Sequence, residues 1–158
     1  MTYDIETFVS DLQSFLNSNF NTKLAAIDSE KNDGITLDTV SSSAYFIQTM
    51  DSRASNYSPF IYIGIEDVKS ESIGPGLGKD YSIIIAIVAQ DMASDDYMWK
   101  RMYRYQRALE ELLNANYADV ASIGYKIKIS SLVPMPFKLM DATNWSRAIG
   151  CSMEVSFA

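Results

Sequence analysis

The first thirty residues place apolar and polar side chains at the spacing of an α-helix. Over residues 5–20 an apolar side chain recurs every three or four positions, and the positions between are polar. We expect Thr2 or Asp4 to cap this helix at its N-terminus. Asparagine and serine are dense over residues 17–21, so the pattern predicts a break there and a shorter helical turn over residues 22–30.

Three segments that follow have the patterns of β-strands. Residues 43–50 form the first, and residues 59–68 alternate Ile61, Ile63 and Ile65 onto one face. Residues 80–90 contain an unbroken apolar run from Ile83 to Val88. Such a run is typical of a central strand that is covered on both sides, or covered by a neighbouring subunit.

A second helix is predicted over residues 95–116. Ser94 can cap it, and acidic side chains in its first turn suit the positive end of the helix dipole. The expected apolar stripe consists of Trp99, Met102, Tyr103, Leu109, Leu112 and Leu113. The expected basic face consists of Lys100, Arg101, Arg104 and Arg107.

Two strands complete the chain. Residues 125–130 alternate apolar and polar side chains, and residues 149–157 do so more regularly, with Cys151, Met153 and Val155 on one face. The order of elements predicts a single α+β domain spanning residues 1–158. We expect a mostly antiparallel β-sheet of four to five strands, with two main helices packed on one face.

The composition argues against catalysis and against metal binding. Histidine is absent, which removes the commonest metal ligand and the usual general base near neutral pH. Cys151 is the only cysteine and lies in an apolar strand pattern, so we expect it to pack as a small hydrophobe. We therefore expect no catalytic residue, no cofactor and no metal. No apolar run is long enough to span a membrane, and the acidic start lacks the pattern of a secretory signal.

The segment 69–79 separates two predicted strands and is rich in serine and glycine, which predicts a hairpin with a long, mobile tip. Its Gly-Pro-Gly-Leu-Gly-Lys stretch is not a phosphate-binding loop, because Ile73 and Asp80 replace the required glycine and hydroxyl residue and a strand follows. The segment is either a flexible tip or a loop that orders on a partner. Its candidate interface residues are Lys69, Glu71, Gly74, Pro75, Gly76, Gly78 and Lys79.

The basic face of the second helix is a further candidate contact. It is either a solvated face, with Arg104 and Arg107 in reach of Glu111 or of acidic residues such as Asp11, or a contact with the acidic surface of a neighbouring copy. The candidate interface residues here are Arg101, Arg104 and Arg107.

Residues 133–145 form the third candidate contact. They combine two prolines, which should block strand pairing, with an unusual number of apolar side chains. The segment either folds back over the core or contacts another subunit. Its candidate interface residues are Met135, Phe137 and Trp145.

The order and texture of these elements resemble phage tail terminator and neck (tail-completion) proteins. The likeness is carried by the helix IETFVSDLQSFL with the trailing KLAAI, and by PFIYIGIED leading through the Gly-rich loop to YSIIIAIVAQD. The helix RMYRYQRALEELL and the closing strand AIGCSMEVSFA extend it over most of the chain.

The resemblance implies a non-enzymatic virion protein, assembled in the host cytoplasm, that forms a ring, commonly a hexamer. Such a ring ends the tail tube and joins the tail to the head connector, so its partners are other copies, the tail tube protein and head-completion or connector proteins. DNA only passes through the lumen, which agrees with a net charge of −7. By the same resemblance, segment 69–79 reaches an adjoining ring or the lumen, and segment 133–145 lies at an interface. Another connector or baseplate component of a phage or phage-derived injection device, and a small ligand-binding module, stay open as alternatives.

Overall fold

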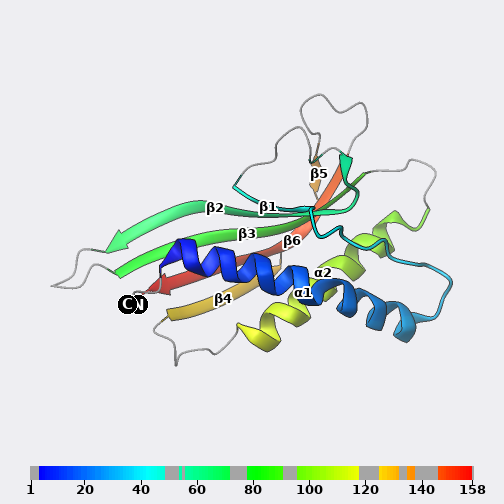
Figure 1. The fold of residues 1–158 in the computed structure, drawn as a ribbon, viewed down its shortest axis with the longest axis horizontal. Helices are drawn as coiled ribbons and strands as arrows, with labels where there is room; N and C mark the ends of the chain where they lie inside the picture. Colours follow the sequence, from blue (N-terminus) through cyan, green and yellow to red (C-terminus); the bar gives the residue numbers. More distant parts are fainter. Residues whose placement is uncertain are drawn as a thin grey trace.

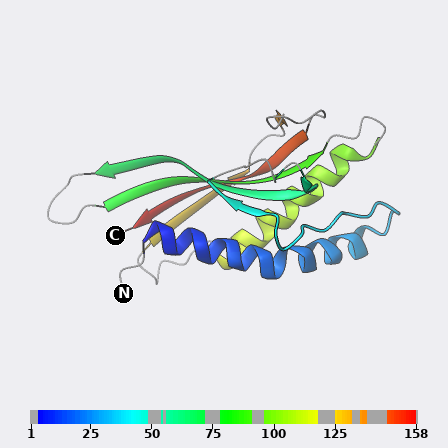
Figure 2. The same ribbon diagram turned by 45° about the horizontal axis from the view of Figure 1, so that its top comes forward.

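The computed structural model describes residues 4–48, 54, 56–71, 78–90, 96–117, 125–131, 135–137 and 146–157. Both helices lie on one side of a single sheet, which confirms the predicted α+β class (Figures 1 and 2). The sheet has six strands, one more than the expected maximum. In chain order the elements are α1 (Ile5–Lys31), β1 (Tyr45–Ile47), β2 (Phe60–Glu71), β3 (Gly78–Gln90), α2 (Met98–Asn116), β4 (Tyr125–Ser131), β5 (Met135–Phe137) and β6 (Ser146–Phe157).

The sheet is mostly antiparallel, as predicted. Its strand order is β1-β2-β3-β6-β4, and only the short β1–β2 pair is parallel. β3 and β6 pair along their whole length, from Lys79 opposite Phe157 to Gln90 opposite Ser146. β4 and β5 follow one another along the other side of β6. β3, which carries the unbroken apolar run, and β6, the most regularly alternating strand, are therefore central strands.

β5 corrects one prediction. We expected the prolines of residues 133–145 to prevent strand pairing, but Met135 pairs with Ala148 and Phe137 pairs with Ser146. Proline is tolerated here because β5 is an edge strand, in which alternate N–H groups point away from the sheet. Trp145, from the same predicted segment, lies outside the described residues.

α1 corrects a second prediction, because it runs without the expected break at residues 17–21. Two of its asparagines, Asn17 and Asn21, bond to the segment that follows the helix and do not interrupt it. The Asn21 amide donates to the Val40 carbonyl oxygen (2.8 Å), the Val40 N–H donates back to Asn21 (2.9 Å), and the Asn17 amide donates to the Ser42 carbonyl oxygen (3.1 Å). Asp4 caps the helix as predicted, accepting from the Thr7 N–H at 2.9 Å.

Residues 33–44 are irregular, yet polar side chains of both helices hold them and the start of β1 in place. From α1, Asp28 accepts from the Leu37 N–H (3.0 Å) and Gln13 donates to the Tyr45 carbonyl oxygen (2.8 Å). From α2, the Tyr105 hydroxyl donates to the Asp38 carbonyl oxygen at 3.0 Å. These bonds satisfy backbone groups that have no strand partner, and they fix the segment that leads from α1 to the sheet.

We predict that Asn21→Ala lowers the free energy of unfolding by about 1–3 kcal/mol, because both backbone groups of Val40 lose their partner. The matched control is Asn19→Ala. The Asn19 amide bonds only to the Phe15 carbonyl oxygen of its own helix, and both variants gain the same helix propensity. Urea denaturation measures the difference. Equal stability of the two variants would contradict the role assigned to Asn21.

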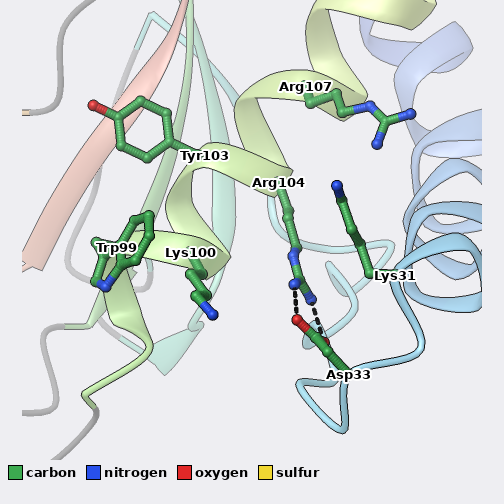
Figure 3. Close-up of a pocket in the computed structure, with 7 residues that line it drawn as sticks. All are labelled: Lys31, Asp33, Trp99, Lys100, Tyr103, Arg104 and Arg107. Carbon is green, nitrogen blue, oxygen red and sulfur yellow. Dashed lines mark hydrogen bonds and ion pairs between the residues drawn. The ribbon is translucent and has the colours of Figure 1, made fainter.

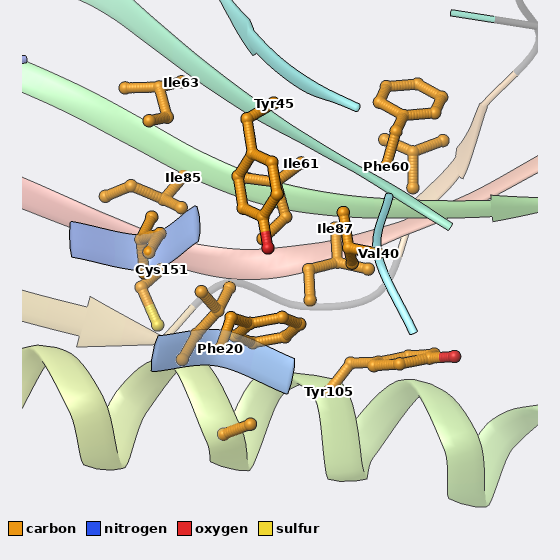
Figure 4. Close-up of a cluster of buried hydrophobic side chains, with 14 of the residues drawn as sticks. Phe20, Val40, Tyr45, Phe60, Ile61, Ile63, Ile85, Ile87, Tyr105 and Cys151 are labelled. Carbon is orange, nitrogen blue, oxygen red and sulfur yellow. The ribbon is translucent and has the colours of Figure 1, made fainter. Parts of the chain in front are cut away.

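The core fills the layer between the sheet and the helices. Phe20 from α1, Tyr105 from α2 and Cys151 from β6 meet there, all with 2% or less of their surface exposed (Figure 4). Cys151 is buried and packs as a small hydrophobe, as the sequence predicts. Its burial raises the pKa of the thiol to about 12. The alternation of β6 is confirmed as well, because Met153 and Val155 are fully buried.

α2 differs from its prediction at its start and on one side. The helix begins at Met98, and its N-cap is Tyr97, which makes no side-chain cap bond, so the predicted cap at Ser94 is wrong. Trp99 and Tyr103 are exposed, although both were expected in the buried stripe. The positions that face the core are instead Met98, Met102, Tyr105, Ala108, Leu109 and Leu113. This stripe starts one residue before Trp99, which rotates both aromatic side chains toward solvent.

Candidate interface at the helix ends

An open hollow of about 410 Å³ lies where α1 ends and α2 begins. Trp99 and Tyr103 lie on one side of Arg104, and Lys31 and Arg107 lie on the other (Figure 3). The residues that line this helix-end hollow are Lys31, Asp33, Trp99, Lys100, Tyr103, Arg104 and Arg107. Four of the seven are cationic and two are aromatic, so it suits an anionic ligand that also carries an apolar surface.

Arg104 forms the floor of the hollow and is 7% exposed. Its guanidinium group makes a two-pronged ion pair with Asp33, and one of the two bonds is 3.1 Å long. It also donates to the Ile35 carbonyl oxygen at 3.3 Å. The hydrogen bonds from Arg104 lower the pKa of Asp33 to about 2, so the pair stays charged at neutral pH.

Arg107 joins the two helices. It donates to both carboxylate oxygens of Glu30 (2.9 and 2.7 Å) and to Glu111 at 2.6 Å, and Glu111 also pairs with Lys23. The predicted pairing of Arg107 with Glu111 is confirmed. Hydrogen bonds to Glu30 and Glu111 raise the pKa of Arg107.

The basic face is thus engaged within the chain. Arg101 donates to the Thr36 carbonyl oxygen, and Arg104 and Arg107 hold α2 against the end of α1. The predicted solvated face and the predicted pairing with acidic residues such as Asp11 therefore do not account for the contacts of these arginines. An interface role for the three arginines stays a prediction.

Three aromatic side chains stand in solvent at this end of α2. Tyr97, Trp99 and Tyr103 are 51%, 57% and 51% exposed, and they are the large hydrophobic side chains with such exposure in the described part of the chain. The ammonium group of Lys100 lies 5.5 Å from the centroid of the Tyr97 ring and 5.7 Å from that of Trp99. Tryptophan and tyrosine are enriched among residues that dominate binding energy at interfaces.

Lys31 and Lys100 leave the hollow with surplus positive charge. Asp33 and Glu30 balance Arg104 and Arg107, but neither lysine makes an ion pair with a carboxylate of the described residues. On a chain of net charge −7 this is a local reversal of sign. The lining of the hollow, with four cationic side chains and one carboxylate, therefore favours an anionic ligand.

The other predicted interface residues lie elsewhere. Lys69 and Glu71 are paired positions of β2, and Gly78 and Lys79 are paired positions of β3, so the predicted loop over residues 69–79 was too long. The strands extend further because β6 supports β3 as far as Lys79. Gly74, Pro75 and Gly76 lie outside the described residues. This end of the β2–β3 hairpin lies away from the start of α2 (Figure 1).

Lys31 was not among the predicted interface residues, and Trp99 and Tyr103 were expected in the buried stripe. A stripe anchored on Met98, Met102, Tyr105 and Leu109 would have put both aromatic residues outside the core. No signal of this kind exists for Lys31, because it reaches the hollow from a helix that ends 67 residues before Met98 begins α2.

The described part of the chain contains no group of three or more His, Cys, Asp or Glu side chains placed to hold a metal ion. Neither of the described helices is long and apolar enough to cross a membrane.

No protein-family model matches the chain, and no curated protein matches it. Among solved structures, it is similar to a chain from the virion of a native gene transfer agent (GTA) particle, with a TM-score of 0.40 and 14% sequence identity. The similarity covers 89% of this chain and 94% of that chain.

Proposed function

We propose that the protein is a structural subunit of a phage-like virion, a ring-forming tail terminator or neck protein. In this role it caps the tail tube and joins the tail to the head connector. The resemblance of its element order to that family supports the proposal, and one feature of the sheet carries it.

That feature is the long free edge of β2. β1 covers β2 only from Ile61 to Ile63, and the next contact on that side is the Gln48 side chain, which accepts from the Ile65 N–H at 3.0 Å. Beyond Ile65, β2 continues to Glu71, and no described strand pairs with its outer side. A free edge of this length is hazardous in a solitary molecule and is useful when another copy covers it.

The position of this edge favours a ring. The free part of β2 lies toward one end of the molecule, and the end of α1 and the start of α2, whose residues line the helix-end hollow, lie toward the other (Figures 1 and 2). Two different surfaces at opposite ends suit a heterologous contact, in which each copy uses one surface toward each neighbour. Such a contact closes into a ring when the rotation from one copy to the next is a whole-number fraction of 360°.

The available side chains favour a role without catalysis. The arginines of the hollow are engaged in ion pairs, and the single thiol is buried with its pKa raised to about 12. The net charge of −7 would let DNA pass through the ring without tight binding.

The proposal predicts a ring of several copies, six by the family resemblance, when the purified protein is concentrated or mixed with tail tube protein. Native mass spectrometry gives the copy number, and negative-stain electron microscopy shows whether there is a central opening. Added during polymerisation of tube protein, it should shorten the tubes and occupy one end of each. A protein that stays monomeric at every concentration and leaves tube length unchanged would refute the proposal.

The hollow favours one alternative, a small ligand-binding module. Its volume of about 410 Å³ falls within the range of small-molecule sites. Such a protein would be a monomer or dimer with a tightly bound anionic ligand, so the same mass measurement separates the two functions.

A further inference from the structure

We infer that the helix-end hollow receives the acidic N-terminal turns of α1 from a second copy of this chain, in a head-to-tail contact. The inference rests on the proposed function, because it names a contact that would build the ring. It depends on the aromatic side chains, the surplus charge, the acidic helix start and the distance between them.

The aromatic side chains are arranged for contact. Trp99 and Tyr103 are separated by one turn of α2, so they project from the same side of the helix, next to Tyr97. More than half of each surface meets water, and a neighbouring chain that covered them would remove that apolar area from solvent. The hollow therefore supplies a hydrophobic contact as well as an electrostatic one.

The charges select an anionic occupant. Asp33 and Glu30 hold the guanidinium groups of Arg104 and Arg107, so these two cations stay fixed at the hollow. Lys31 and Lys100 add positive charge that no described carboxylate offsets in an ion pair. An occupant with two or three carboxylates would meet this surplus without displacing either existing pair.

The start of α1 has the complementary chemistry. Asp4, Glu6 and Asp11 are exposed there, and the sequence has no lysine or arginine from residue 4 to residue 22. The segment is a regular helix capped by Asp4, so its backbone is already held in place. A rigid acidic segment loses little conformational freedom when it binds.

The contact cannot form within one chain. α1 has 27 residues and is therefore about 40 Å long. Its acidic start and the end that lines the hollow point toward opposite ends of the molecule (Figures 1 and 2). A second copy must supply the acidic segment, and the pair then still has one unused surface of each kind, the helix start of one copy and the hollow of the other. The contact therefore repeats from copy to copy.

Two variants that each lose one surface test the inference. The hollow variant is Trp99→Ala with Lys100→Glu, and the helix variant is Glu6→Gln with Asp11→Asn. We expect each variant alone to associate at least about 100-fold more weakly than the natural chain, and circular dichroism checks that each is folded. Ser18→Glu is the control, because Ser18 is exposed in the middle of α1 and its substitution also changes the charge.

Mixing the two variants gives the decisive measurement. One intact hollow and one intact helix start remain in the mixture, so native mass spectrometry should find heterodimers and no larger ring. If a double variant does not fold, Lys100→Glu and Glu6→Gln replace it as single changes in the same mixture.

The outcomes separate this inference from the proposed function. If the natural chain forms rings and both variants form them equally well, the head-to-tail contact is wrong while the ring stands. Variants that stay monomeric when mixed would also overturn it, since the hollow would then serve a different partner. If the natural chain never assembles, alone or with tube protein, the proposed function itself fails.

Discussion

Replacing Gly150 with alanine should lower the free energy of unfolding by about 3 kcal/mol or more, and the variant should accumulate poorly as folded protein. Gly150 lies in β6 opposite Ala86 of β3, at the centre of the sheet. A Cβ atom at this position would overlap the Ile85 carbonyl oxygen and lie 2.8 Å from the Ala86 Cα atom. These are backbone atoms of a strand that is paired on both sides, so they cannot move aside cheaply. Thermal and urea denaturation measure the loss.

Gly64→Ala is the matched control. A Cβ atom there meets only the outer ring atoms of Tyr62, a side chain that can rotate away. We expect a cost of about 1 kcal/mol, in the range for a mild overpacking change. If Gly150→Ala proves as stable as Gly64→Ala, β3 and β6 do not approach as closely as described here. Gly150→Ala also tests the contact between β6 and α2, because the Gln106 amide donates to the Gly150 carbonyl oxygen at 2.9 Å.

The sheet could be predicted well because its signal is local. Alternation of side chains decides which face of a strand is buried, and Ile61, Ile63, Cys151 and Met153 alternate clearly. The strand ends could not be predicted in the same way. β3 continues through Lys79 because β6, more than sixty residues further along the chain, pairs with it there. β2 continues through Lys69 because it pairs in turn with this part of β3.

Polar residues limited the prediction of the helices. Asparagine disfavours a helix when its side chain competes for the local backbone, which is why a break was expected at residues 17–21. Asn21 instead bonds to Val40, nineteen residues away, so the competing interaction became a tertiary one. A partner of this kind is invisible in the helix sequence.

The candidate interface was predicted only in part, for a related reason. The basic side chains of α2 are evident from their spacing, but their partners Glu30 and Asp33 lie around the end of α1. The packing of the two helices decides which cationic side chains form ion pairs. It leaves Lys31 and Lys100 without a carboxylate partner among the described residues. A sequence pattern can indicate charge on a helix, whereas the net charge of a hollow depends on packing.

Phe20→Ala should be the second severely destabilising change, with a loss of about 3–5 kcal/mol in the free energy of unfolding. Phe20 is fully buried between the sheet and α2, in the same cluster as Tyr105 and Cys151 (Figure 4). Truncation leaves a cavity bounded by strands and a helix, and such a site collapses poorly. Its position depends on α1 remaining helical through residues 17–21.

Phe15→Ala is the control for this change. Phe15 is only partly buried and packs edge-on against Tyr117, with 5.4 Å between the ring centroids, so its truncation should cost distinctly less. Urea denaturation of both variants compares the two sites. A similar loss for both would mean that the second half of α1 is not anchored in the core, as a helix broken near Asn19 would imply. A much larger loss for Phe20→Ala agrees with a continuous α1 whose second half is anchored in the core, and this continuous helix of about 40 Å separates its acidic start from the helix-end hollow.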